Sequence, residues 1–240
     1  MKPIKSRADG YPVMLSFDDG PRPGSTERVL EVLARRGLEP DRPLRAAFFT
    51  LARNPGGWWA RRLLFAPYEI WTDKGSLECY PDLARRIVEE GHWLGNHGTT
   101  HFWPRWPWYR NRRRVVAQLR GWEHVADAVV PAWRGQSACL ARAPYLIRTS
   151  AWRAATAQTG FADLAGLTTG DADPRADCDD VRRTLLMRLA QEHRLAEQSG
   201  RPVVLIFHDI RDLTAGCLDQ WLDAISAAGY ALTDFDPDRL

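Results

Sequence analysis

The 240-residue chain lacks several features that would place it in a familiar class of protein. Its four cysteines lie far apart and form no Cys-x-x-Cys pair, which excludes a zinc knuckle and indicates no disulfide framework. We therefore expect reduced thiols at all four positions, Cys79, Cys139, Cys178 and Cys217. No internal repeat, low-complexity tract or linker divides the chain, so a single domain is expected.

Long apolar runs and a strong charge imbalance are also missing. No stretch is long enough to span a bilayer, and residues 1–10 are polar, without the apolar segment of a secretory signal. For the chain as given this predicts a cytoplasmic protein; a secreted or cell-envelope protein trimmed of its signal would look the same. The net charge of +3 does not demand nucleic acid, and no nucleic-acid recognition motif accompanies the arginines. The densest basic cluster, Arg110 and Arg112 to Arg114, is expected to be a solvated first turn of a helix.

Apolar, β-rich runs alternate with helical patterns along the chain. The predicted strands cover 13–17, 44–51, 93–95, 139–141, 161–167, 202–207 and 230–233. The predicted helices cover 26–36, 81–90, 112–129, 150–158, 179–198 and 214–228. Strands that alternate with helices form right-handed crossovers and a parallel sheet, and seven strands favour a closed or nearly closed barrel.

The predicted domain covers residues 11–240, after an N-terminal tail of residues 1–10. An inserted loop is expected at about 52–79, because this segment is too long for an ordinary connection. The segment carries Trp58, Trp59, Tyr68 and Trp71, which fit either a lid over a site or an insertion packed on the domain surface. Three tryptophans at helical positions are expected in the core, Trp122, Trp152 and Trp221.

Polar side chains follow three of the predicted strands directly. Asp18 and Asp19 end the first, His97 and His101 follow the third, and His208 follows the buried run 202–207. The carboxyl ends of strands are where α/β folds place their chemistry. One carboxylate and two histidines are a common catalytic zinc set with an open position for water, and the second carboxylate is then free to act as a base. Each cluster alone could be a turn or a structural histidine, but the combination favours a catalytic site.

These motifs resemble those of the polysaccharide deacetylase family, which is the NodB homology domain or carbohydrate esterase family 4. Residues 16–21, Ser-Phe-Asp-Asp-Gly-Pro, are similar to the family's Thr-Phe-Asp-Asp-Gly-Pro, and residues 97–101 to its His-Ser/Thr-x-x-His. Residues 142–145 are similar to Arg-x-Pro-Tyr, and residues 205–208 stand where Leu-x-His is expected. The resemblance extends over about residues 11–235 and implies an α/β fold, a distorted (β/α)7 barrel in a single domain.

The resemblance also implies roles for individual residues. Asp19, His97 and His101 would bind a divalent metal ion, first of all zinc, with cobalt or nickel as alternatives because oxygen and nitrogen ligands accept several ions. Asp18 would be the general base, and Arg142 would pair with it and keep it ionised.

The same resemblance assigns the remaining catalytic groups. The backbone N–H of Tyr145 would help to hold the oxyanion formed by attack on an acetamide carbonyl. His208 would be the general acid, and Asp171 is the candidate for the carboxylate that keeps this histidine protonated near neutral pH.

Several positions depart from the family pattern. Gly98 replaces the usual Ser/Thr, and Thr99 is the hydroxyl that can compensate. Leu146 stands where a glycine commonly follows the tyrosine, while Thr168 and Ala172 replace an aspartate and an aromatic residue of the fourth motif. The metal set and both proton-transfer groups are retained, so we expect an active enzyme.

Tryptophan is abundant, with eleven in the chain, and Trp103, Trp106 and Trp108 closely follow the second histidine. Because flat aromatic faces stack on sugar rings, Trp103, Trp106 and Tyr145 are candidates for contact with substrate; rings packed under a proline-stiffened loop are the alternative.

The expected function is metal-dependent removal of N-acetyl groups from a glycan that contains N-acetylhexosamine, such as peptidoglycan or chitin oligosaccharide. Two alternatives remain open. The same site could act on a small acetylated sugar or another non-polymeric amide, or the chain could be a glycan-binding protein descended from a hydrolase. Retention of Asp18 and His208 argues against the last, because binding needs no proton-transfer groups.

Overall fold

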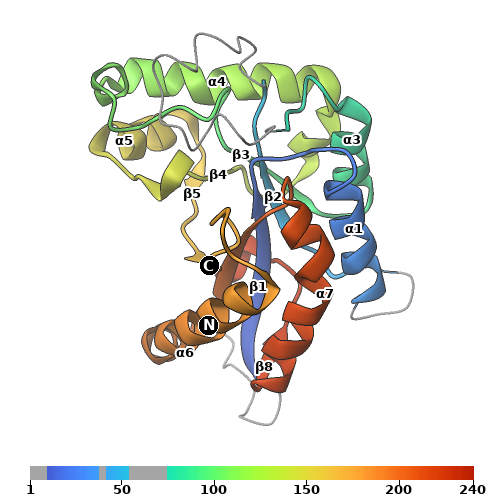
Figure 1. Ribbon diagram of the computed structural model, residues 1–240. Coiled ribbons are helices and arrows are strands. Elements are labelled where there is room, and N and C mark those ends of the chain that lie inside the picture. The colour runs from blue at the N-terminus through green and yellow to red at the C-terminus, as the bar shows by residue number, and fades with distance from the viewer. Residues whose placement is uncertain (1–9, 38–41, 54–74) are drawn as a thin grey trace.

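A computed structural model describes residues 10–37, 42–53 and 75–240. In it a parallel sheet curls into a half-barrel, and helices cover its outer face (Figure 1). Residues 1–9 of the predicted tail lie outside the described residues. So do residues 54–74 of the predicted insertion, which include its three tryptophans and Tyr68.

All the strand pairs of the described sheet are parallel, in the order β5-β4-β3-β2-β1-β7-β6, with β8 beside the first residues of β1. The strands are β1 (Tyr11–Asp18), β2 (Ala47–Thr50), β3 (Trp93–Asn96), β4 (Leu140–Ala141), β5 (Ala162–Asp163), β6 (Leu167–Thr168), β7 (Val203–His208) and β8 (Tyr230–Leu232). The predicted (β/α)7 architecture is confirmed as this curled sheet in a single domain.

The longer helices follow the strands in the predicted alternation. They are α1 (Thr26–Arg35), α3 (Pro81–Glu89), α4 (Arg112–Val129), α5 (Ser150–Thr159), α6 (Cys178–Ser199) and α7 (Asp212–Ala227). Polar side chains begin three of them: Asn111 caps α4, Thr149 caps α5, and Asp177 forms a capping box at α6. Across the described part of the chain, no helix is long and apolar enough to cross a membrane.

Alternation along β1 separates the core from the site. Val13, Leu15 and Phe17 belong to the main core beneath the helices, whereas Met14 belongs to a second cluster with residues from β2 and β7. Ser16 and Asp18 lie on the same face of the strand as Met14, because side chains alternate along a strand. This face is therefore apolar at Met14 and polar toward the carboxyl end of β1. Three tryptophans are fully buried as predicted, namely Trp122, Trp152 and Trp221.

The strand predicted over 161–167 is wrong, because the structure has two short strands there. β5 pairs with β4, and β6 pairs with β7, so the two form opposite edges of the sheet. Gly166 lies between them, where an added Cβ would fall 2.8 Å from the Val204 carbonyl oxygen and from Ile206 Cγ1. The chain can make this close approach only without a side chain. The break leaves β5 and β6 as edge strands, which is why the barrel stays half open.

The prediction of four reduced thiols is also wrong. Cys178 and Cys217 form a disulfide with a Cα–Cα distance of 5.8 Å, whereas Cys79 and Cys139 are free. The first half-cystine begins α6 and the second lies within α7, and these helices pack together although the two residues are 39 positions apart. Their pairing follows from helix packing, which the spacing of cysteines along the chain does not reveal.

Removing this disulfide should destabilise the domain. We expect the double substitution Cys178→Ser/Cys217→Ser to lower the free energy of unfolding by about 4 kcal/mol, because a loop of roughly 40 residues would no longer be closed in the unfolded chain. Denaturant unfolding measures this change, with Cys79→Ser as the control at a free thiol. An unchanged free energy in the double variant would contradict the prediction.

Candidate active site

Asp19, His97 and His101 converge at the carboxyl ends of β1 and β3. Asp19 Oδ1 lies 3.6 Å from His97 Nε2 and 3.4 Å from His101 Nε2. The three ligand atoms lie within 4.8 Å of one another, and Asp19 and His97 are buried. One carboxylate oxygen and two imidazole nitrogens at this spacing fit a zinc-type ion that keeps an open position.

The backbone after β1 separates the two adjacent aspartates. Asp19 has a φ of 78°, in the left-handed region that few residues other than glycine, asparagine and aspartate tolerate. Its N–H donates to the Phe49 carbonyl oxygen at 3.1 Å, which fixes the turn against β2. This turn points Asp19 at the histidines and leaves Asp18 in the strand, where it meets a different partner.

The loop that carries the two histidines is braced from two sides. His97 Nδ1 lies 2.9 Å from the Arg142 carbonyl oxygen, so this nitrogen carries the proton and Nε2 keeps its lone pair for a metal. Gly98 has a φ of 96°, and an added Cβ would fall 3.0 Å from the Thr100 carbonyl oxygen, which accounts for the missing Ser/Thr. The Thr99 hydroxyl donates to the Gln118 carbonyl oxygen at 2.7 Å and fastens the loop to α4.

Asp18 forms a buried ion pair with Arg142, which directly follows β4. Arg142 Nη1 donates to Asp18 Oδ1 at 2.6 Å and to Ser16 Oγ at 2.9 Å, and its guanidinium lies 4.0 Å from the centre of the Phe49 ring. Complete burial lowers the pKa of Arg142, and the Asp18 carboxylate opposes that shift. Because both charges are out of water, each needs the other, and the pair holds the Asp18 carboxylate in one orientation.

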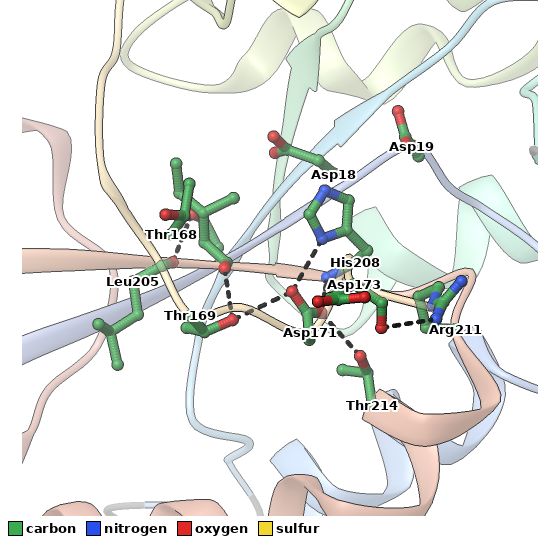
Figure 2. Close-up of polar contacts among 12 residues, drawn as sticks. Asp18, Asp19, Thr168, Thr169, Asp171, Asp173, Leu205, His208, Arg211 and Thr214 are labelled. Atoms are coloured by element: carbon green, nitrogen blue, oxygen red, sulfur yellow. Dashed lines mark hydrogen bonds and ion pairs between the residues drawn. The ribbon is translucent and has the colours of Figure 1, made fainter. Parts of the chain in front are cut away.

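His208, the last residue of β7, is held by Asp171. Its Nδ1 lies 3.0 Å from Asp171 Oδ1, and its backbone N–H donates to Oδ2 at 2.7 Å. The hydroxyls of Thr214 and Thr169 donate to the same carboxylate at 2.7 and 3.0 Å. Figure 2 shows the imidazole between Asp171 and the adjacent aspartates Asp18 and Asp19. Asp171 therefore lies in direct hydrogen-bonding contact with His208.

Electrostatics make this pair an imidazolium and a carboxylate at neutral pH. Burial by itself lowers the pKa of His208, but the charge and hydrogen bond of Asp171, together with the charges of Asp19 and Asp18, outweigh it and raise the pKa to about 9. Burial likewise works to raise the pKa of Asp171, and the contacts with His208 and Thr214 reverse this and lower it. His208 thus holds a proton at Nδ1 and at Nε2, and the second faces the site.

Aromatic side chains form one wall beside the histidines. The Tyr145 ring lies 4.3 Å from that of His101 and 4.5 Å from that of Trp103, measured between ring centres. Tyr145 and Trp103 are 37% and 39% exposed, whereas Trp106 is half-buried. Tyr145 and Leu146 both have a φ of 57°. A glycine, which commonly follows this tyrosine in the family pattern, adopts such a φ without strain, whereas Leu146 is strained there.

Sequence reasoning missed Asp209, which is buried directly after His208. Its Oδ2 accepts a hydrogen bond of 2.6 Å from the Thr26 hydroxyl, and burial raises its pKa to about 7. An added Cβ on Gly20 would fall 2.1 Å from the same oxygen, so this carboxyl packs against the turn that follows Asp19. Its adjacency to His208 at a strand end was the signal available.

Comparison with known proteins identifies the family. Residues 5–163 match the family model described as polysaccharide deacetylase. The chain belongs to this family. It is similar to a chitooligosaccharide deacetylase of Rhizobium leguminosarum bv. trifolii, with 32% identity over 94 residues, which cover 39% of this chain and 31% of that protein. The chain spans about a third of the length of the curated relatives it matches.

Solved structures of deacetylases and esterases share the fold. The chitin deacetylase of Colletotrichum lindemuthianum has a TM-score of 0.67 and 21% identity, with 97% of this chain and 89% of that chain covered. A family 4 acetyl xylan esterase of Clostridium thermocellum, in complex with a cobalt ion, has a TM-score of 0.62 and 18% identity, with 93% and 87% covered. At these identities the likeness shows a common fold.

Proposed function

We propose that this deacetylase-family hydrolase depends on a divalent metal and removes N-acetyl groups from glycans that contain N-acetylhexosamine, such as peptidoglycan or chitin oligosaccharide. The proposal is supported by one observation: the Asp19, His97 and His101 cluster lies beside buried Asp18, which pairs with Arg142, and beside His208, whose pKa is raised. Residues 11–240 are the proposed catalytic domain.

Asp19, His97 and His101 would hold the metal, for which zinc is proposed first and cobalt or nickel as alternatives. The fold neighbour in complex with cobalt supports a divalent ion in this architecture. When bound, such an ion polarises the acetyl carbonyl and makes water a better nucleophile. The donor set of two imidazoles and one carboxylate is compatible with all three ions.

The protein's own groups account for the proton transfers. Asp18, oriented by Arg142, takes a proton from the attacking water, and the Tyr145 backbone N–H donates to the developing oxyanion. As the carbon–nitrogen bond breaks, His208 gives its Nε2 proton to the leaving nitrogen while Asp171 holds Nδ1. The products are acetate and a free amine.

Trp103 is proposed to stack on a sugar ring next to the scissile acetamide, together with Tyr145 and with Trp106 further along the loop. We expect Trp103→Ala to raise KM for a chitin oligosaccharide by about two- to tenfold and to change kcat little, since aromatic contacts are worth roughly 0.5–1.5 kcal/mol. Trp103→Phe should restore most of the affinity. An unchanged KM in the alanine variant would assign the ring to packing.

One observation favours the second candidate, a small acetylated sugar or other amide. Ala172 is exposed where the family motif has an aromatic residue, so one ring of the groove for a polymer is missing. A panel of chitin oligomers, peptidoglycan fragments, N-acetylhexosamine monomers and simple amides separates the two. Acetate from the oligomers supports the glycan function, and acetate from small molecules alone would replace it with the second candidate.

The disulfide bears on localisation. Disulfides form and persist mainly in oxidising compartments, so Cys178–Cys217 favours a secreted or cell-envelope protein over a cytoplasmic one. Counting free thiols in protein taken directly from its native compartment tests this: two free thiols support the proposal, and four would contradict it.

A further inference from the structure

The charge along the chain is one-sided next to the candidate metal site. Between Glu90 and Glu123 there is no acidic residue, whereas there are six arginines. Arg120 pairs with Glu123, but the other five are exposed, and none has an ion pair with an acidic residue of the described part of the chain. These five are Arg105, Arg110, Arg112, Arg113 and Arg114.

This basic segment is fastened to the loop of the two histidines. Gln118 on α4 accepts hydrogen bonds from Thr99 through its carbonyl oxygen and from the Thr100 N–H through Oε1, at 2.7 and 3.0 Å. The Tyr109 hydroxyl contacts Gln118 Nε2 at 3.4 Å. The Trp103 ring packs against the Tyr145 ring, which in turn packs against the His101 ring. The arginines are thus held at one edge of the site.

Exposed aromatic faces lie among the arginines. Trp103 and Trp108 are 39% and 56% exposed, and the Arg114 guanidinium lies 4.3 Å from the centre of the Trp108 ring. Flat rings suit sugar faces, and guanidinium groups form paired hydrogen bonds with carboxylates. We refer to Trp103, Arg105, Trp108, Arg110 and Arg112–Arg114 as the basic rim.

The protein's own stability does not account for this arrangement. Arg112, Arg113 and Arg114 occupy the first turn of α4, which has no acidic residue, although negative charge is favourable there and neighbouring positive charges repel. Near the start of α6, by contrast, the positive charges are paired: Arg182 and Arg183 each form an ion pair with an aspartate three positions earlier. A solvated turn explains why the rim is exposed, but it does not explain why acidic partners are missing.

We propose that the glycan substrate is acidic and that its carboxylates bind the basic rim while a neighbouring N-acetyl group lies at the candidate metal site. This inference rests on the proposed deacetylation and adds the substrate class. A glycan is favoured over nucleic acid because the rim continues into the wall formed by Trp103, Tyr145 and His101.

Two oligosaccharides of equal length test the proposal with the zinc-loaded protein. One is a neutral chitin oligosaccharide; the other is a hyaluronan oligosaccharide, in which a carboxylate-bearing sugar alternates with N-acetylglucosamine. At low ionic strength the acidic probe should bind about tenfold more tightly, since several exposed charge pairs contribute a few tenths of a kcal/mol to 1 kcal/mol each. In about 1 M salt, where the Debye length is about 3 Å, the preference should disappear.

Matched variants locate the effect. Arg112→Gln/Arg113→Gln should reduce the preference for the acidic probe about fivefold, whereas Arg182→Gln/Arg183→Gln removes the same charge from α6 and should leave it unchanged. Equal affinity for both probes, or equal loss in both variants, would overturn the proposal. So would tighter binding of a single-stranded oligonucleotide of the same charge.

Acetate release, measured in the same samples, separates this inference from the proposed function. Release from chitin without any preference for the acidic probe would leave deacetylation standing and overturn the acidic substrate. Preference without release from either probe would support the rim as an anion-binding surface and count against deacetylation.

Discussion

Asp19→Asn should abolish metal binding and deacetylation together. The substitution removes the only carboxylate of the Asp19, His97 and His101 cluster, and it keeps a side chain that tolerates the left-handed φ of 78°. We therefore expect a folded protein that holds no stoichiometric metal. Loss of several kcal/mol of transition-state stabilisation should reduce kcat by at least about a thousandfold.

Asp18→Asn is the matched control at the neighbouring position. Its side chain pairs with Arg142 and lies outside the ligand cluster, so the variant should keep its metal. Turnover should fall by about 10²–10⁴-fold, the range of a general base. Metal content by elemental analysis and acetate release decide the assignment: metal lost from the Asp18 variant and kept by the Asp19 variant would show that the two roles are reversed.

Asp171→Asn should shift the pH dependence of catalysis. In the native protein the pKa of His208 is about 9, so the acid is protonated at neutral pH and activity is lost as pH rises through that value. Without the Asp171 charge the strongest interaction that raises this pKa is lost, burial still lowers it, and only the smaller effects of Asp19 and Asp18 oppose burial, so the pKa should fall to or below its ordinary value of about 6.5. The basic limb then moves to lower pH, and kcat at pH 8 should drop by about 10²–10³-fold.

Asp173→Asn provides the comparison for this shift. Asp173 lies two residues further along the same loop, is exposed, and contacts the backbone of Arg175 rather than His208. Its pH profile should match that of the native protein. A basic limb that stays in place in Asp171→Asn, or moves equally in both variants, would contradict the role given to Asp171.

The catalytic groups could be anticipated because chain direction fixes where they lie. Apolar runs end directly before Asp18 and directly before His208, and a short strand ends before His97, so a parallel sheet brings all three strand ends to one edge. The ion pair of Asp18 with Arg142 and the contact of His208 with Asp171 were implied by the family resemblance and are present in the structure. Their catalytic roles stay proposals.

Other features depend on packing in three dimensions and leave little trace in the sequence. The division of residues 161–167 into two edge strands follows from the approach of Gly166 to β7. The pairing of Cys178 with Cys217 follows from the packing of α6 on α7. The burial of Asp209 against Gly20 is set by the turn after β1, whose left-handed residue no hydrophobic pattern predicts.

The most direct test of the account is zinc titration of chelated protein, followed by acetate release from chitin oligosaccharides. We predict that the chelated protein releases no acetate and that activity rises with added zinc to a plateau at one equivalent per chain. The same saturation should be missing in Asp19→Asn. Equal release from the chelated protein, or no release from any acetylated glycan by protein that holds one zinc per chain, would contradict the central claim of metal-dependent glycan deacetylation.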